Sequence, residues 1–254
     1  MYRFVDMHCH LDLMANGPQV AANARGRGIA LLNASVTPQG YRCARERYAD
    51  APAVRCAAGL HPWWVSDGSC GDDDVARLAL DLASERFVGE VGLDLGKRHA
   101  HARARQEAAF ERIVRACAEN PLPGRVLTIH AVRSAGTVLD ALERYDLTRS
   151  AACIFHWFSG TSEELARARR AGCLFSVNGM MLATRRGREY ARIIPQKQLL
   201  LETDAPAEQG APGAAADLEA ALQATLSRLA QIRGVDEAGL EHAVAERGAE
   251  LLGL

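Results

Sequence analysis

Histidine and carboxylate side chains at the ends of short apolar runs are the residues of this chain best suited to binding a metal ion. His8 and His10 close the first apolar run, and four further residues of metal-binding type lie at the ends of later runs: Glu90, His130, His156 and Asp204. Side chains at positions i and i+2 of an extended strand point to the same face, so both imidazoles of the first pair could reach one cation. This recurrence predicts a metal site.

The number of candidate ligands indicates more than one ion. Six protein donors exceed what one open catalytic zinc ion takes, and a mixed imidazole and carboxylate set suits zinc or manganese. Two divalent ions about 3.5 to 4 Å apart, bridged by a carboxylate and a water, would use all six donors. Such a pair lowers the pKa of bound water and clamps the attacking and leaving oxygens of a phosphoester. The implied reaction is hydrolysis.

Apolar runs alternate with helical patterns along the whole chain. After the run that ends at His8, apolar runs occupy residues 29–36, 53–60, 86–91, 125–129, 151–155, 173–177 and 198–202. Helical patterns occupy residues 18–27, 72–84, 103–119, 134–145, 162–171 and 184–194, with one more opened by Thr37 and Pro38 and the last beginning at Ala215. Strands separated by helices pair in parallel through right-handed crossovers.

Eight such units predict an α/β fold, a single (β/α)8 TIM barrel that forms one domain over residues 1–254. An open doubly wound sheet is the alternative, but it would place ligands mostly at one crevice. The candidate donors come from the first, fourth, fifth, sixth and eighth strands. Only a closed ring brings these five strand ends together.

Composition limits the classes of function. The chain of 254 residues is 48% hydrophobic and 24% charged, as in ordinary globular proteins. A formal net charge of −1 argues against holding duplex DNA by a bulk positive field, although a local basic patch remains possible. The seven scattered cysteines include no Cys-x-x-Cys pair, and neither a secretory signal nor an apolar run of about 20 residues is visible. We therefore expect a cytoplasmic protein without a membrane partner.

Six motifs occur in an order that resembles the TatD-type metal-dependent hydrolases. They are DMHCHLD at residues 6–12, GLHP at 59–62, GEVGLD at 89–94, IH at 129–130, HWFSG at 156–160 and ETDAP at 202–206. The resemblance implies an amidohydrolase-like barrel that acts as a deoxyribonuclease, often a 3′ to 5′ exonuclease, on single-stranded or frayed DNA ends. It also implies two divalent ions, magnesium, manganese or zinc, as cofactors.

The resemblance assigns roles by position. One ion would be held by His8, His10 and Asp204, the second by His130 and His156, and both by a bridging Glu90. Asp204 would also orient or deprotonate the attacking water, so Asp204 and Glu90 are the expected catalytic residues. His61 would lie near the substrate phosphate.

Residues around the expected site are candidates for substrate contact. Trp63 could stack an exposed base or pack under a loop, and the sequence leaves both interpretations open. The family arginine two residues after the fifth-strand histidine is replaced by Val132, so Arg133 is the candidate phosphate contact. Residues 208–216 replace the arginine- and asparagine-bearing loop of the family, so the substrate range could differ.

Other polar residues are expected to support the site or to face solvent. Asp6, Asp94 and Glu202 would orient ligands or cap loops. His99 and His101 lie in an arginine-rich connection and are expected to face solvent. Trp157 is expected to pack beside the metal ions as one wall of the site. The arginines near residues 167–170 and 185–188 are expected to be solvated unless they line the mouth of the site.

Two other functions remain open. An amidase or lactonase could use the same activated water on a carbonyl group, but Glu90 takes the place of a carbamylated lysine bridge, which favours phosphoesters. A subunit with a mainly binding role is the other alternative. Residues 156–160 and 175–182 look closest to TatD-like members of bacterial anti-phage cassettes, which would imply protein partners in a defence complex. The oligomeric state is left open.

Overall fold

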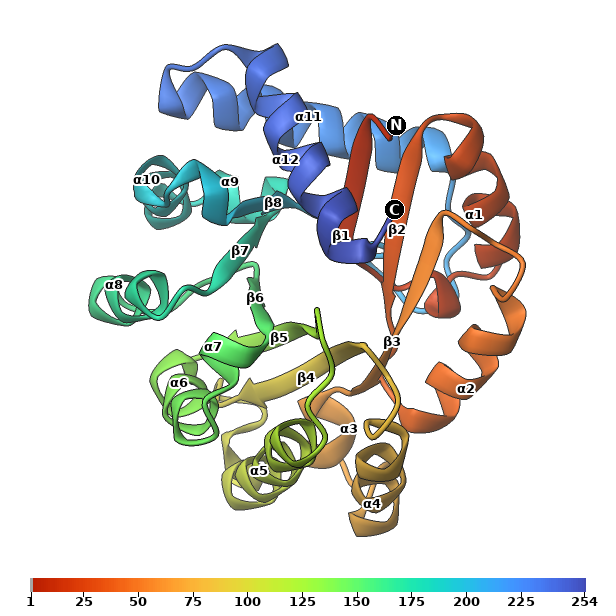
Figure 1. Ribbon diagram of the computed structural model, residues 1–254, viewed down its shortest axis with the longest axis vertical. Coiled ribbons are helices and arrows are strands. Elements are labelled where there is room, and N and C mark those ends of the chain that lie inside the picture. Colours follow the sequence, from red (N-terminus) through yellow and green to blue (C-terminus); the bar gives the residue numbers. More distant parts are fainter. Residues whose placement is uncertain (1) are drawn as a thin grey trace.

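Parallel strands form a closed barrel in which each strand pairs with the next one along the chain and β8 pairs with β1 (Figure 1). The structure is a computed structural model that describes residues 2–254. The strands are β1 (Phe4–Cys9), β2 (Ile29–Ala34), β3 (Val54–Leu60), β4 (Phe87–Asp94), β5 (Val126–Val132), β6 (Ala152–His156), β7 (Leu174–Val177) and β8 (Leu199–Leu201). The closed ring confirms the predicted (β/α)8 barrel and excludes the open doubly wound sheet.

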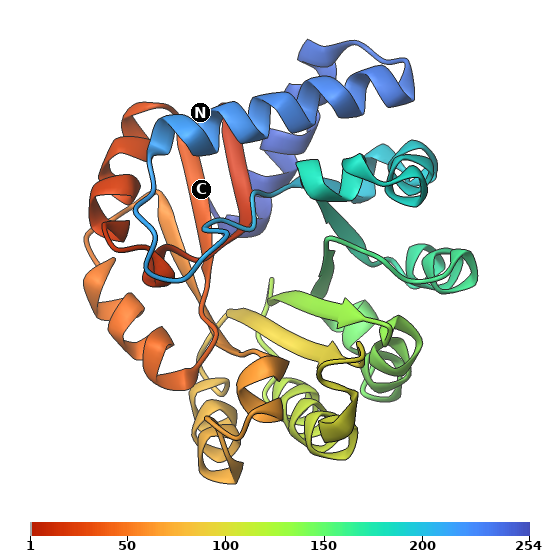
Figure 2. The same ribbon diagram turned by 180° about the vertical axis from the view of Figure 1, so that it is seen from behind.

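Helices surround the ring, as the view from the opposite side also shows (Figure 2). They are α1 (Gly17–Gly26), α2 (Pro38–Arg47), α3 (Pro62–Ser66), α4 (Asp72–Asp81), α5 (Arg103–Glu119), α6 (Ala135–Arg144), α7 (Leu147–Ser150), α8 (Ser162–Arg170), α9 (Gly179–Ala183), α10 (Arg185–Ile193), α11 (Ala215–Arg233) and α12 (Glu237–Leu252). Short 3-10 turns cover Leu11–Leu13, Ala100–Ala102 and Gln196–Gln198.

The strands read as continuous apolar runs because both of their faces are covered. Every residue of β1 and of β2 is buried. Alternate side chains fill the inside of the barrel, and the others pack against the surrounding helices. This leaves the strand ends and the connecting loops as the places where polar side chains can gather.

The strand pairing is irregular beside several of the candidate donors. The register between β1 and β2 shifts between Asp6 and Cys9, which brackets His8. The register between β4 and β5 shifts between Val88 and Val91, which brackets Glu90. Such irregularities re-aim side chains near functional sites.

The amino-terminal end of the barrel is closed by α12, which lies in front in Figure 1. Leu251 and Leu252 at the end of this helix join an apolar cluster with Val5 and Met7 of β1. The backbone carbonyl of Leu252 also accepts a hydrogen bond from Arg55 Nε at 3.1 Å. One end of the barrel is therefore sealed by packing, and the carboxyl ends of the strands face the other end.

The elements differ from the predicted ones at their boundaries and in short helices. The fourth strand was predicted at residues 86–91 but extends to Asp94, and the fifth was predicted at 125–129 but extends to Val132. The helices α3, α7 and α9 were not predicted, because runs of 4 to 5 residues are too short to show helical periodicity. No helix within residues 2–254 is long and apolar enough to cross a bilayer.

Gly92 allows β4 and β5 to approach closely, and replacing it should destabilise the barrel. Its φ is 143°, and a Cβ there would lie 2.0 Å from the backbone oxygen of His130. We expect Gly92→Ala to lower the free energy of unfolding by about 2 to 3 kcal/mol in urea unfolding followed by circular dichroism.

The matched control is Gly26→Ala at the end of α1, where a Cβ meets no atom within 4 Å. This substitution should leave stability unchanged or raise it by less than about 1 kcal/mol. Equal stabilities for the two variants would contradict the close-approach argument.

Candidate metal centre

The six predicted donors converge at the carboxyl-terminal end of the barrel. His8 lies in β1 and His10 just after it, while Glu90, His130 and His156 belong to three further strands. Asp204 follows β8. Three groups of these and neighbouring side chains have donor atoms within 4.8 Å of one another: His8 with His156 and Glu202, His8 with His10 and Asp204, and His61 with Glu90 and His130.

The carboxylate of Glu90 stands at the centre of the cluster and is only 2% exposed. Its Oε1 faces His130 Nδ1 at 2.8 Å, His156 Nε2 at 2.9 Å and His61 Nε2 at 3.2 Å. Its Oε2 faces His8 Nε2 at 3.2 Å and His10 Nε2 at 3.5 Å. Each oxygen therefore has its own set of imidazoles, which is the arrangement that a carboxylate bridging two cations requires.

Asp204 completes the side of the cluster that contains the first two histidines. Its Oδ1 lies 3.3 Å from His10 Nε2 and 3.7 Å from His8 Nε2. Its backbone takes a left-handed conformation, with φ of 58°, and its N–H donates to the carbonyl of His8 at 2.9 Å. Because its side chain is 19% exposed, this carboxylate is more accessible to water than Glu90.

Contacts at the far side of two rings orient their metal-facing nitrogens. His10 Nδ1 donates to the carbonyl oxygen of Ala34 at 2.6 Å, so Nε2 is the ring nitrogen that faces the cluster and that a metal ion would bind once its proton is lost. His8 Nδ1 lies 2.6 Å from Thr128 Oγ1, which leaves its Nε2 toward the cluster. A metal-binding histidine typically has such a partner on its other ring nitrogen. The geometry therefore fits metal ligation.

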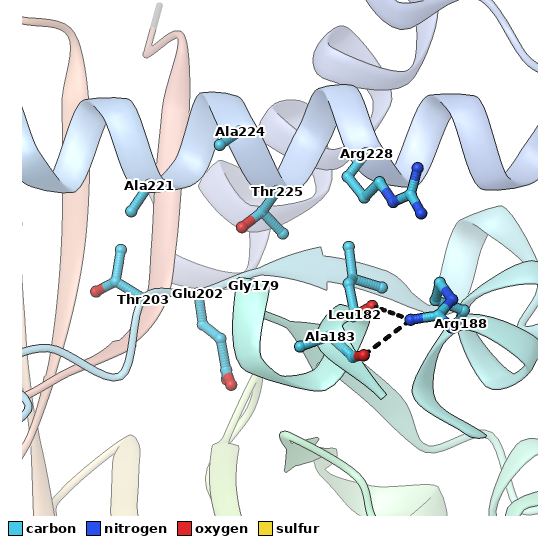
Figure 3. Close-up of a pocket in the computed structure, with 10 residues that line it drawn as sticks. All are labelled: Gly179, Leu182, Ala183, Arg188, Glu202, Thr203, Ala221, Ala224, Thr225 and Arg228. Carbon is cyan, nitrogen blue, oxygen red and sulfur yellow. Dashed lines mark hydrogen bonds between the residues drawn. The ribbon is translucent and has the colours of Figure 1, made fainter. Parts of the chain in front are cut away.

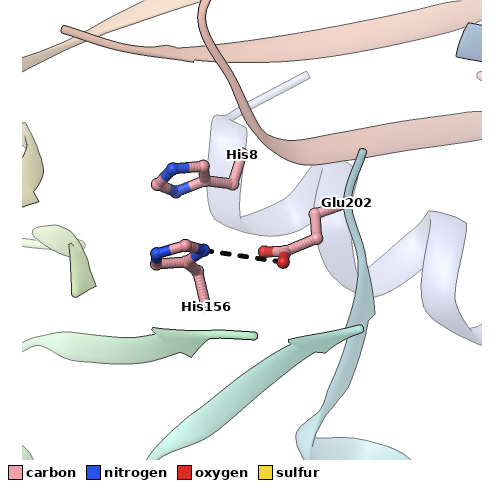
Figure 4. Close-up of side chains that lie close together, drawn as sticks. All are labelled: His8, His156 and Glu202. Atoms are coloured by element: carbon pink, nitrogen blue, oxygen red, sulfur yellow. Dashed lines mark ion pairs between the residues drawn. The ribbon is translucent and has the colours of Figure 1, made fainter. Parts of the chain in front are cut away.

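Glu202 lies behind His156 at ion-pair distance rather than at hydrogen-bond distance (Figure 4). Its Oε1 lies 3.6 Å from His156 Nδ1, while His156 Nε2 faces Glu90. Glu202 is fully buried, and it accepts hydrogen bonds from Asn178 Nδ2 at 2.8 Å, from the backbone N–H of Trp157 at 3.1 Å and from the Ser176 hydroxyl. These donors compensate the cost of burying the carboxylate.

Asp94 links His130 to the rim of the site. Its Oδ2 lies 3.4 Å from His130 Nε2 and accepts a hydrogen bond from Trp63 Nε1 at 2.7 Å. The indole of Trp63 stacks on the ring of His99 with centroids 5.3 Å apart. The expectation that His99 faces solvent is wrong, because this ring is partly buried against Trp63. His101 is exposed, as expected.

The shifts in pKa favour an ionised Glu90 and protonated rings at His10 and His156. Burial opposes ionisation of Glu90, but the surrounding imidazoles, with His61 the strongest, hold its pKa well below the usual value. Burial also opposes protonation of His10, yet Asp204 and Glu90 raise its pKa to about 9. The pKa of His156 is raised well above its ordinary value by Glu90 and Glu202 against the effect of burial.

Two other histidines stay neutral. Burial lowers the pKa of His8 to about 4, with the nearby His156 acting in the same direction. Burial likewise lowers the pKa of His61 to about 4. A neutral imidazole offers the lone pair that a metal needs, so His8 can bind an ion without losing a proton.

The other predicted residues lie nearby in different settings. His61, expected near a substrate phosphate, is 4% exposed and packed against Glu90 inside the donor cluster. Trp63 is 43% exposed at the rim, and Trp157, expected as a packing wall, is 36% exposed. Arg133 is exposed just after β5, with φ of 54°.

Two of the outer contacts are not predicted by the sequence patterns. Thr128 and Ala34 hold the outer nitrogens of His8 and His10, yet neither residue type indicates a functional site. Thr128 lies two positions before His130 on β5, where strand alternation places both side chains on one face. That spacing is the signal that could have indicated Thr128.

Together, the closed barrel and its carboxyl-end cluster of imidazoles and carboxylates define a metal-dependent hydrolase of the (β/α)8 class. A family model described as TatD related DNase matches residues 5–253. The chain belongs to this family.

Similar proteins agree with this assignment. A protein named 3′-5′ ssDNA/RNA exonuclease TatD from Pantoea sp. (strain At-9b) is 32% identical over 193 residues, covering 74% of this chain and 72% of that protein. The protein of the same name from Citrobacter rodentium (strain ICC168) is 29% identical over 242 residues, covering 92% and 89%.

Solved structures share the fold. A TatD homologue from Escherichia coli K12 has a TM-score of 0.80 at 24% identity, with 99% of this chain and 98% of that chain covered. An organophosphorus hydrolase from Deinococcus radiodurans has a TM-score of 0.59 at 13% identity, with 98% and 92% covered.

Asp6 should make the stability of the metal-free protein depend on pH. Burial raises the pKa of this carboxyl to about 7, against hydrogen bonds from Thr203 and the His8 backbone. Because the pKa is higher in the folded state than in the unfolded state, stability falls as pH rises between about 4 and 7. We expect the stability of the wild type relative to Asp6→Asn to fall by about 2 to 3 kcal/mol between pH 5 and 7.5, because the contributions of the nearby histidines are common to both proteins.

The measurement is urea unfolding with a chelator present at both pH values. Asp50→Asn, which changes an exposed aspartate outside the site, should keep the wild-type dependence. If Asp6→Asn shows the same pH dependence as the wild type, the titrating group is another residue.

Proposed function

We propose that this member of the TatD family removes nucleotides from the 3′ end of single-stranded DNA, using two divalent ions held on either side of Glu90. The observation that carries the proposal is the geometry at Glu90, whose two carboxylate oxygens face separate sets of imidazoles. The name 3′-5′ ssDNA/RNA exonuclease of its relatives supports the direction and the substrate.

The donor set divides into two groups around the bridging carboxylate. His8, His10 and Asp204 would hold one ion, and His130 and His156 the other. Divalent ions in this place would lower the pKa of water and neutralise charge that develops on the phosphoryl oxygens. Magnesium, manganese and zinc all accept such oxygen and nitrogen donors.

Asp204 is the residue best placed to handle the proton of the attacking water. Its carboxylate is the more exposed of the two, and its hydrogen bond from His10 holds its pKa below the ordinary value although burial opposes this. An ionised carboxylate at the open side of the site can orient the water and accept its proton.

Three residues would contact the substrate. His61 lies against Glu90 and could reach a phosphoryl oxygen. Trp63 has one face against His99, which leaves the other face for a nucleobase. Arg133 is exposed at the end of β5, from where its guanidinium could bind a backbone phosphate.

The metal centre itself would also suit an amide or lactone, because the same fold and ions hydrolyse both phosphorus and carbonyl centres. Membership of the family favours the phosphodiester. Binding to protein partners in a defence complex stays a prediction.

Glu90→Gln should slow hydrolysis about a thousandfold. The amide keeps the shape of the side chain but loses the charge between the two proposed ions, which should cost several kcal/mol of transition-state stabilisation, or about a thousandfold in rate. The measurement is release of nucleotides from a labelled oligonucleotide with magnesium, manganese or zinc, together with the metal content of the purified protein.

Glu246→Gln, which changes an exposed glutamate on α12 at the opposite end of the barrel, is the matched control and should retain wild-type activity and metal content. Equal residual activity in Glu90→Gln and the control would refute the proposed centre.

The direction of digestion can be read from end-labelled substrates. A single strand labelled at its 5′ end should give a ladder of progressively shorter labelled products, and phosphorothioate linkages at the 3′ end should block it. Immediate release of a labelled mononucleotide from the 5′ end would show the opposite polarity and overturn the proposed direction.

A further inference from the structure

A cavity lies beside the metal centre, between α9 and α11 (Figure 3). It has a volume of about 460 Å³ and is lined by residues of α9, α10 and α11 and by the segment that follows β8. This volume is within the range of pockets that bind small ligands. A cavity of this volume is large enough for one nucleotide unit.

Small side chains keep the cavity open. Gly179 and Ala183 line it from α9, and Ala221 and Ala224 line it from α11. A Cβ at Gly179 would lie 3.8 Å from the hydroxyl oxygen of Thr225 on the facing helix. The two helices therefore approach each other at Gly179, and the small side chains beside this contact leave the cavity unfilled.

Two arginines stand at one end of this cavity. Arg188 is held in place because its Nη1 donates to the carbonyl oxygens of Leu182 at 3.1 Å and Ala183 at 2.8 Å. Arg228 is exposed on α11, and Figure 3 shows both guanidinium groups on the same side of the cavity. A pair of guanidinium groups is a strong recognition element for phosphate oxygens.

The other end of the cavity adjoins the metal centre. Glu202 and Thr203 line it there, and the next residue is Asp204. The carboxylate of Glu202 is turned to hydrogen-bond donors of the protein, among them Asn178 Nδ2 and the Trp157 N–H. Its charge is thus compensated within the protein.

We infer that this cavity holds a nucleotide of the substrate strand away from the bond that is cleaved, with the backbone phosphate bound between Arg188 and Arg228. The inference rests on the proposed nuclease function. A strand whose reacting phosphate lies at Glu90 and Asp204 can pass over Thr203 and enter the space between α9 and α11. A flexible single strand can follow this path, whereas a stiff duplex cannot.

The inference is tested by the binding of single strands of increasing length. Fluorescence polarisation of labelled oligonucleotides of two to eight nucleotides, with chelator present to prevent cleavage, measures affinity at several salt concentrations. Arg228→Ala should weaken binding of the longer strands about tenfold at low salt. Loss of one phosphate contact should also reduce the slope of log affinity against log salt by about 0.7.

A second variant tests the cavity without changing charge. Ala224→Phe places a large side chain on an exposed position of α11 that lines the cavity. It should reduce the gain in affinity that accompanies strand length while keeping the wild-type salt slope within error. The control is Arg149→Ala on α7, an arginine whose side chain is 82% exposed on the helix that precedes β6, and it should bind like the wild type.

The outcomes separate this inference from the proposed function. If the wild type cleaves single strands while both Arg228→Ala and Ala224→Phe bind every length as the wild type does, the inference is overturned and the nuclease function stands. If the wild type neither binds nor cleaves any single strand, the proposed function fails and the inference fails with it.

Discussion

The attraction between one buried carboxylate and the imidazoles around it determines how the rest of the structure must be built. Glu90 is almost completely buried, and its oxygens face five histidine rings at 2.8 to 3.5 Å. Such a cluster is costly in a protein interior unless cations neutralise it. It also requires side chains from strands far apart in the sequence, and ring closure supplies them because all the parallel strands end at the same edge.

An outer layer of contacts makes this arrangement specific. The carbonyl of Ala34 holds His10, and the carboxylates of Glu202 and Asp94 approach the outer nitrogens of His156 and His130. Each partner restricts the rotation of a ring and determines which nitrogen faces inward. The buried polar groups are therefore satisfied mostly by one another, and the apolar strands around them provide the rigid frame.

The sequence predicts the centre better than the rim, for physical reasons. His8, Glu90 and Asp204 could be found because each marks the end of an apolar run, and a barrel makes all run ends neighbours. The bond from Trp63 to Asp94 and the stack on His99 depend instead on loop conformations that no periodicity encodes. For the same reason the short helix α9 was missed, although it forms one wall of the cavity beside the site.

Protons and metal ions compete for the same positions in this cluster. Without an ion, the raised pKa of His10 and of His156 lets protonated imidazoles supply the positive charge that Glu90 and Asp204 attract. An ion must displace these protons, because a ring nitrogen that carries a proton cannot donate its lone pair. Binding of metal is thus coupled to proton release at two histidines, whereas His8 and His61 are already neutral. The carboxylates that attract the ions also raise the pKa of the neighbouring imidazoles. In acid, protons therefore compete more strongly with the ions for these ring nitrogens, and the ions bind more weakly.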